Sequence, residues 1–389
     1  MANNNKHTGP NVPALRFPEF SGEWKTFQLS DLAVYSKERV KMEILSSNNY
    51  VSTENMQHNF AGIKDAISLP SSGTAVEFQV GDILISNIRP YLKKIWLSDR
   101  NGGCSTDVLA LRTKNEKVDS SFLYCCLAND DFVSYVMSGA KGVKMPRGDK
   151  QHILSYNLGV PSVQEQRRIA ELVSLLEKRI SAQSKIIEEL TTLRSALLEK
   201  VFQVSNPTLE VGAIAHQTSE RNKLYRYSNV LSVSNRFGFI NQSEQFEGRN
   251  VASDDVRNYK VVHRGDFAYN PARINVGSIA MLKNFESGIV SPMYICFQVD
   301  DTIVDPSFFE LFLETKAFKD EMEIRLEGSV RRCLSFEALC EIHLPRPALL
   351  VQRSISDKIG NISSKIKLED RILRSYIRQK EWLLKQMFI

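Results

Sequence analysis

Two copies of a long heptad pattern constrain the fold of this chain more than any other feature. The segment from Val160 to Phe202 carries apolar residues at alternating spacings of three and four, which is the a/d pattern of a coiled coil. The C-terminal segment repeats this pattern without a gap, so that Pro161 aligns with Pro347 and Phe202 aligns with Phe388. A repeat of this length in heptad register predicts two long helices that pair with each other.

The expected seam of these helices is apolar in both copies apart from two polar positions. Gln183 aligns with Glu369, and Arg194 aligns with Lys380. We predict that the seam consists of Val173, Leu176, Ile180, Ile187, Leu190, Leu197 and Val201 in the first copy and of Ile359, Ile362, Ile366, Leu373, Tyr376, Leu383 and Met387 in the second.

A globular segment precedes each helix, and the two segments carry the same motifs in the same order. Gly81–Asp82 aligns with Gly265–Asp266 at the start of a predicted strand. Each segment then predicts further strands, one capped helix over 120–139 or 305–322, and a basic loop that contains glycine. The chain therefore contains two copies of one unit, each a mixed α/β globule followed by a helix.

The predicted fold class is α/β (α+β), with two pseudo-repeated mixed α/β domains and two long helices that pair as an antiparallel coiled coil. We expect the first domain over 1–160, the central helix over 161–203, the second domain over 204–344 and the C-terminal helix over 345–389. A helix of roughly 35–38 residues is about 55 Å long, and the obvious partner for its apolar stripe is its own repeat.

Composition limits the class of protein. A chain of 389 residues exceeds one core of ordinary size, and 42% hydrophobic with 24% charged residues is typical of a globular protein. No apolar run approaches the roughly 20 residues that cross a bilayer, and the polar N-terminus lacks a signal peptide's apolar core, so we expect no membrane association and a cytoplasmic location. A net charge of +5 allows a nucleic-acid partner without requiring one.

The cysteines and histidines do not form the spacings of a metal site. The six cysteines show no C-x-x-C pair and mostly have apolar neighbours, so we expect reduced thiols that are largely buried. The six histidines are scattered along the chain. We therefore expect neither a metal site nor disulfides.

Basic, polar and aromatic residues gather at equivalent places in both globular segments. Arginine and lysine contact guanine edges or phosphates, and asparagine can pair with adenine. Two similar paired helices would hold two different domains at a fixed separation. This arrangement fits either a protein that binds two separated sites on duplex DNA or a scaffold with two protein-binding domains. The recurrence favours DNA, and the candidates are Asn87, Arg89, Tyr91, Lys93, Lys94, Lys141, Lys144 and Arg147 in the first segment and Tyr269, Asn270, Arg273, Arg331 and Arg332 in the second.

The sequence resembles the specificity (S, HsdS) subunit of type I restriction-modification systems. The resemblance is carried by SNIRPYLKKIWLSDRNGGCSTDVLALR, by its counterpart YNPARINVGSIAMLKNFESGIVSPMYICF, by the opening LRFPEFSGEW and by the repeated Pro…Gln-Arg…Ile helix starts. It implies that each globule is a target recognition domain for one half of an asymmetric, interrupted DNA site. It also implies that the helices set the spacing and bind two methyltransferase (M) subunits, which motor/endonuclease (R) subunits join.

The resemblance further implies a chain that is not itself an enzyme and has no catalytic residues. Asn270-Pro271-Ala272-Arg273 is only half of a methyltransferase's Asn/Asp-Pro-Pro-aromatic motif, and no G-x-x-x-x-G-K-[ST] phosphate loop occurs. S-adenosylmethionine, ATP and Mg²⁺ are therefore expected on the partner subunits rather than on this chain. Two other functions remain open from the residues alone: a protein-binding scaffold without DNA recognition, and a self-sufficient nuclease.

Overall fold

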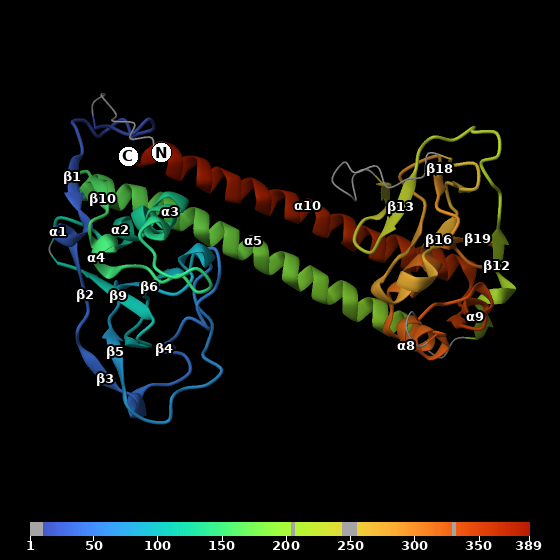
Figure 1. The fold of residues 1–389 in the computed structure, drawn as a ribbon, viewed down its shortest axis with the longest axis horizontal. Helices are drawn as coiled ribbons and strands as arrows, with labels where there is room; N and C mark the ends of the chain where they lie inside the picture. Colours follow the sequence, from blue (N-terminus) through green and yellow to red (C-terminus); the bar gives the residue numbers. More distant parts are fainter. Residues whose placement is uncertain (1–10, 115, 204–206, 243–254, 329–331) are drawn as a thin grey trace. The chain divides into compact units, whose positions relative to one another are not determined.

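The computed structural model describes residues 11–114, 116–203, 207–242, 255–328 and 332–389. The chain divides into two compact units, one running to Ser184 and including Arg371–Ile389, the other comprising Lys185–Asp370. The division falls inside both long helices, so each unit holds one globular domain and part of each helix (Figure 1).

The first unit contains an antiparallel four-stranded sheet in the order β2-β9-β6-β7, a second sheet in the order β3-β5-β8-β4, and the pair β1-β10. Its elements in chain order are β1 (Lys25–Gln28), α1 (Leu29–Leu32), β2 (Ala33–Tyr35), β3 (Arg39–Lys41), the 3-10 helix η1 (Met42–Ile44), β4 (Tyr50–Val51), β5 (Thr74–Phe78), β6 (Ile83–Ser86), the 3-10 helix η2 (Pro90–Leu92), β7 (Ile95–Leu97), β8 (Gly102–Cys104), β9 (Val108–Thr113), α2 (Ser120–Leu127), α3 (Asp130–Ser138), α4 (Lys150–Leu154), β10 (Asn157–Val160) and α5 (Val163–Gln203).

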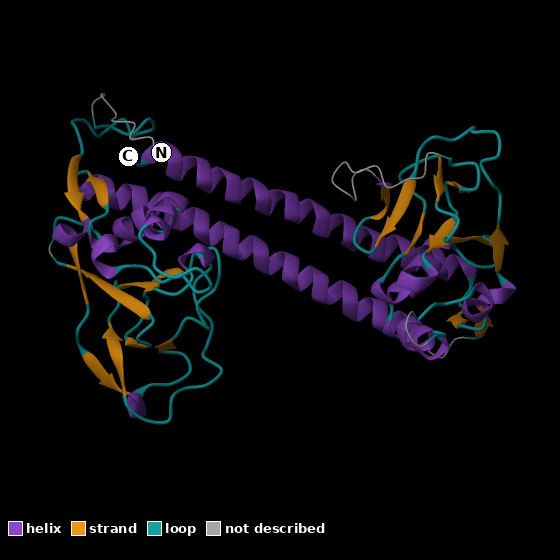
Figure 2. Cartoon of the chain, viewed as in Figure 1, coloured by secondary structure: helices purple, strands orange, loops and turns teal. Residues whose placement is uncertain are grey.

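The second unit repeats the main sheet as β12-β19-β16-β17 and holds the two-stranded sheets β15-β18, β13-β14 and β11-β20. Figure 2 distinguishes the strands from the helices by colour. Its elements are β11 (Thr208–Glu210), η3 (Val211–Ala213), β12 (Ala215–Thr218), β13 (Leu231–Ser234), β14 (Gly238–Asn241), β15 (Lys260–His263), β16 (Phe267–Tyr269), η4 (Pro271–Val276), β17 (Ile279–Met281), β18 (Ser287–Val290), β19 (Ile295–Val299), α7 (Pro306–Glu314), α8 (Lys316–Arg325), α9 (Phe336–Cys340), β20 (His343–Pro345) and α10 (Leu349–Met387).

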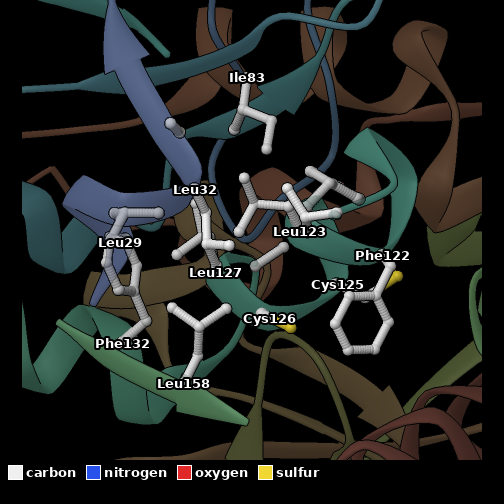
Figure 3. Packing of buried hydrophobic residues seen from close by; sticks show 14 of the residues in the cluster. Leu29, Leu32, Ile83, Phe122, Leu123, Cys125, Cys126, Leu127, Phe132 and Leu158 are labelled. Atoms are coloured by element: carbon white, nitrogen blue, oxygen red, sulfur yellow. The ribbon is translucent and has the colours of Figure 1, made fainter. Parts of the chain in front are cut away.

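The core of the first unit lies between the main sheet and the helices. Leu29 and Leu32 of α1 and Ile83 of β6 point into the same cluster as the apolar face of α2 (Figure 3). Phe122 of α2 stacks on Phe388 at the end of α10, with ring centroids 5.6 Å apart. In the second unit Phe308 of α7 packs in the same way on Phe202 at the end of α5, at 4.8 Å. Each domain is therefore anchored to the end of one long helix.

A buried glutamine joins each domain to the start of its own helix. Gln166 has no exposed surface; its Oε1 accepts the backbone N–H of Asp119 at 2.7 Å, and its Nε2 donates to the carbonyls of Lys117 and Pro161 at 2.8 and 2.9 Å. Asp119 is the N-cap of α2, so one side chain satisfies backbone groups of both the domain and the helix.

Gln352 makes the equivalent contacts in the second unit. It accepts the N–H of Asp305, the N-cap of α7, at 2.9 Å, and it donates to Pro347 and Ile303 at 2.8 and 3.3 Å. The aligned glutamines of the repeat thus have a shared structural role.

The two long helices pack together in both units. In the first unit the start of α5 lies against the end of α10, where Val173 and Met387 share a buried cluster. In the second unit the end of α5 lies against the start of α10, where Leu198 and Ile359 share another. The helix segments therefore run antiparallel in each unit, as the repeat predicts. With 41 and 39 residues the helices are slightly longer than the roughly 35–38 residues expected.

Four of the predicted seam residues are buried, namely Val173, Leu176, Ile359 and Met387, and the other ten are half-buried. The polar seam positions are also enclosed. In the first unit Lys380 Nζ donates to Glu177 Oε1 at 2.6 Å. In the second unit the residues aligned with these two make the equivalent contact, where Arg194 Nε donates to Ser363 Oγ at 2.7 Å. Gln183 and Glu369 are buried as well. Polar groups in a helix seam fix its register, because a shifted register would leave them without partners.

The single capped helix expected in each domain is wrong, since each region forms two helices. Asn129 interrupts the first region: it is the N-cap of α3, and its Oδ1 accepts the N–H of Phe132 in the first turn of that helix. Thr315 does the same for α8 through the N–H of Phe318. Side-chain oxygens that cap a new helix turn the chain where periodicity alone predicts continuation.

The described part of the chain contains no helix that is long and apolar enough to span a membrane. The six cysteines are free, as predicted, with four buried and two partly buried. Burial raises the pKa of Cys104 and of Cys296 to about 12, so both remain thiols at neutral pH.

Candidate DNA-binding interface

The loop after β6 carries five of the predicted residues of the first unit. Asn87 is buried against Gly148, where any Cβ would lie 2.9 Å from the Asn87 Oδ1 atom. Arg89 and Lys93 bracket η2 with left-handed backbone conformations, at φ of 50° and 56°. This backbone turns the side chains of Arg89 and Tyr91 into solvent.

The basic glycine loop forms a small closed turn beside this first loop. Lys141 and Arg147 exchange two backbone hydrogen bonds of 2.9 Å, and Gly142 permits the turn with a φ of 93°. The backbone N–H of Arg89 donates to the carbonyl of Pro146 at 2.8 Å, and the N–H of Gly148 donates to that of Asn87 at 3.0 Å. The two segments selected from the sequence are therefore in direct contact.

Several of the predicted basic side chains already have partners within the domain. Lys93 pairs with Asp130 at 2.7 Å, and Arg147 pairs with Asp107 at 2.9 Å. Lys141 pairs with Asp149 at 3.0 Å. In a separate interaction Lys94 donates to the carbonyl of Thr53, and burial lowers the pKa of its ammonium group.

Three candidates of the first unit are exposed and form no ion pair or side-chain hydrogen bond within the described ranges: Arg89, Tyr91 and Lys144. Their charge and aromatic surface face solvent, which is the condition for binding an external partner. They are the members of the predicted set best placed to contact DNA.

The second unit has an equivalent pair of loops. Asn270 Oδ1 accepts the N–H of Ala272 and caps η4, while Arg273 is exposed and unpaired among the described residues. The glycine loop closes through Glu327 and Cys333, whose backbones exchange hydrogen bonds of 2.9 and 2.8 Å. Its last segment meets the first loop where the N–H of Leu334 donates to the carbonyl of Pro271 at 3.2 Å.

Three candidates of the second unit require comment. Tyr269 has no exposed surface, and its hydroxyl donates to the carbonyl of Leu334 at 3.2 Å, so it supports the loops and cannot contact DNA. Burial in this apolar site also raises the Tyr269 pKa. Arg332 is turned toward α8 and pairs with Glu323 at 2.9 Å. Arg331 lies outside the described residues.

Two segments that the sequence analysis did not select also touch these loops. Residues 57–62 contact η2 in the first unit, and residues 235–238 contact the segment after η4 in the second. Only the second had a sequence signal: Asn235-Arg236-Phe237-Gly238, between apolar alternating residues, is typical of a hairpin turn.

Comparisons with known proteins show what this chain is similar to. A family model for the "Type I restriction modification DNA specificity domain" matches residues 21–192. The MjaVIII type I restriction enzyme specificity subunit of Methanocaldococcus jannaschii is 23% identical over 391 residues, which cover 91% of this chain and 89% of the relative. The type I S subunit from M. genitalium shares the fold, with a TM-score of 0.62 at 17% identity over 97% of this chain and 99% of that one.

These comparisons confirm the resemblance to type I restriction-modification specificity subunits that the sequence motifs indicate. A chain from a structure concerning complex assembly and conformational transition of the type I R-M system has the same fold, with a TM-score of 0.54 and 17% identity over 94% of this chain and 97% of that one. Specificity subunits are non-catalytic, so the family confirms the prediction that this chain is not an enzyme. In the described ranges no three His, Cys, Asp or Glu side chains are grouped to hold a metal ion.

Proposed function

We propose that each globular domain of this specificity subunit reads one half of an asymmetric, bipartite DNA site. Residues 1–160 and 204–344 are the two target recognition domains, and the helices of 161–203 and 345–389 set the number of unread base pairs between the half-sites. Because the two domains carry different side chains on equivalent loops, the recognised sequence is not a palindrome.

The observation that carries this proposal is the paired loop in each domain. The segment after β6 and the segment after β16 each meet a glycine loop through backbone hydrogen bonds, and each presents an exposed arginine, Arg89 or Arg273. Loops fixed by their backbones hold exposed side chains in place, which base recognition requires. Lys144 at the tip of the first glycine loop supplies a phosphate contact and salt-dependent affinity.

We further propose that the long helices bind two methyltransferase (M) subunits, which motor/endonuclease (R) subunits then join. Helix α5 exposes Leu175 and Leu193, and α10 exposes Leu368 and Trp382, four large apolar side chains that a protein partner would cover. S-adenosylmethionine, ATP and Mg²⁺ bind to those partners, and the complex works in the compartment that holds the DNA, the cytoplasm. The methyltransferases flip the target adenines.

The test is to express this chain with a cognate methyltransferase subunit and to sequence the host DNA by a single-molecule method that detects methyladenine. We expect a motif in two unequal parts with a fixed gap, absent when this chain is omitted. Insertion of matched heptads into α5 and α10 is expected to change the gap while leaving both halves unchanged.

The opposite result is a stable complex that methylates no new motif. That outcome would favour the two-headed protein-binding scaffold over DNA recognition. A motif that appears without this chain would likewise contradict the proposal, because the specificity would then reside in the methyltransferase.

A further inference from the structure

A short antiparallel ribbon lies beside the proposed base-reading loop in each domain, and neither ribbon belongs to the set chosen from the sequence. In the second unit the ribbon is β13-β14, paired from Leu231–Asn241 to Ser234–Gly238. Three residues close it, Asn235, Arg236 and Phe237, and all three are exposed. Gly238 has a φ of 65°, the left-handed conformation that ends a three-residue hairpin loop.

The tip of this ribbon is held against the loop that contains Arg273. Ser278 Oγ donates to the carbonyl of Val233 at 3.1 Å, and a Cβ at Gly277 would lie 3.3 Å from the Asn235 Cβ. Below the tip, Val233 and Phe239 belong to a buried cluster. The base of the ribbon is therefore rigid, and only its tip faces solvent.

At the tip of this ribbon Arg236 carries a charge that has no ion-pair partner among the described residues. The Arg236 guanidinium lies 5.2 Å from the centre of the Phe237 ring, and within the described ranges it forms no ion pair. Phe237 is 63% exposed, which is unusual for a phenylalanine. By contrast Arg257, which lies near the exposed ring of Tyr225, donates to both carboxylate oxygens of Asp255.

The first unit has a comparable ribbon at 56–63. Met56 and Ile63 form an antiparallel bridge, and the N–H of Gln57 donates to the carbonyl of Gly62 at 2.8 Å. The turn contacts the base-reading loop through backbone hydrogen bonds. The N–H of Asn59 donates to the carbonyl of Leu92 at 3.2 Å, and the N–H of Phe60 donates to the carbonyl of Lys93 at 2.8 Å. His58 and Asn59 are exposed at the tip.

Backbone strain gathers at this contact. In the described chain five residues other than glycine have a positive φ, and four of them, Asn59, Phe60, Arg89 and Lys93, lie on these two touching loops. Such conformations cost energy and persist where the surrounding structure enforces them, most often at functional sites.

We propose that these ribbon tips are a second base-contacting element in each recognition domain, with His58 and Asn59 reading one half-site and Arg236 and Phe237 reading the other. The inference rests on the proposed function and extends it. A two-stranded ribbon fits the major groove of B-DNA, arginine pairs with guanine, asparagine pairs with adenine, and an aromatic ring contacts the thymine methyl group. Each half-site is thus read by two adjacent segments.

The test compares methylation motifs of the complex with Arg236→Ala, Phe237→Ala, His58→Ala and Asn59→Gly. Glycine at position 59 removes the side chain and keeps the positive φ. Arg236→Ala or Phe237→Ala is expected to reduce discrimination roughly tenfold at one or more bases of one half-site only, and the first-unit variants are expected to affect only the other half.

Two further variants sharpen the test. Arg264→Ala removes an exposed arginine of the same domain that pairs with Glu286, and it is expected to leave both half-sites unchanged. Arg236→Lys keeps the charge but loses the two-pronged geometry, so it is expected to retain affinity without restoring discrimination. Thermal denaturation and copurification with the methyltransferase subunit check that each variant folds.

A wild-type complex with a bipartite motif and an Arg236→Ala variant with the same motif and rate would overturn this inference while leaving the proposed function intact. A uniform loss of methylation at all sites, with no change in motif, would also overturn it, because the tip would then contact only phosphates. Absence of a bipartite motif in the wild type would refute the proposed function itself.

Discussion

The two domains are most alike where each joins the long helices and least alike where each faces solvent. Gln166 and Gln352 make the same three contacts, and Phe122 and Phe308 each pack on a helix-end phenylalanine. In contrast, the strands β3, β5, β8 and β4 form one four-stranded sheet in the first unit. In the described part of the second unit the pair β15-β18 is extended by isolated bridges, from Arg221 to Lys260 and from Val230 to Ile289, and the ribbon β13-β14 forms a two-stranded sheet. Duplicated attachments with divergent surfaces are expected of two domains that have one geometric task and two recognition tasks.

The largest expected effect tests whether the phenylalanine anchors are equivalent. We expect Phe122→Ala and Phe308→Ala each to lower the free energy of unfolding by about 3–5 kcal/mol, since each residue is fully buried and truncation leaves a cavity. Urea denaturation of the full chain measures the loss. Phe237→Ala removes an exposed ring and is the matched control; a similar loss there would contradict the assignment of the core.

The glutamines provide the next comparison. Gln166→Ala and Gln352→Ala leave buried backbone groups of a helix cap without a partner, and we expect a loss of about 2–4 kcal/mol in each. The exposed neighbour Arg353 serves as the control, where alanine is expected to cost less than about 0.5 kcal/mol. A loss of stability in only one of the two glutamine variants would show that Gln166 and Gln352 do not have the same structural role.

The polar seam contacts sharpen the comparison at smaller energies. Lys380 and Glu177 are both partly exposed, so solvent screens the pair, and we expect Lys380→Met to cost about 1 kcal/mol or less. A double-mutant cycle with Glu177→Gln isolates the coupling. In the other unit Arg194 contacts both Ser363 and Glu314, so its coupling is expected to be divided between two partners. Zero coupling at Lys380 would mean that this pair does not specify the register.

The smallest expected effect is the loss of stability at low pH that follows from the protonation of Asp149. The hydrogen bond from Lys141, followed by backbone N–H groups of His152 and Gln151, lowers the pKa of Asp149 to about 2. The pKa of Asp149 in the folded state is below its unfolded value of about 3.9. The ionised carboxylate therefore stabilises the fold fully above about pH 4, and this stabilisation is lost as the pH falls toward about 2.

At the equivalent helix start, α9 is capped by Ser335, which does not titrate, so only the first glycine loop is expected to respond to acid. An NMR titration checks both points: Lys141→Ala should raise the Asp149 pKa, and Lys144→Ala should leave it unchanged. An unchanged pKa in Lys141→Ala would rule out the ion pair as its main cause.

The repeat and its periodicity determined much of this fold in advance. Heptad spacing predicted two long paired helices, and the order of motifs in the two copies predicted an equivalent basic loop with glycine in each domain. These features depend on local spacing and on residues close in sequence, so a single chain is enough to read them.

Tertiary structure alone decided which candidates reach solvent. Tyr269 was selected from the same segment as the exposed Arg273, yet it is buried and its hydroxyl donates to the carbonyl of Leu334. Lys93 and Arg147 are paired with Asp130 and Asp107. The contact of residues 57–62 with η2 joins segments about 30 residues apart through backbone hydrogen bonds. The pattern of side chains along the sequence does not predict such contacts, because backbone hydrogen bonds can form between any residues that the fold brings together.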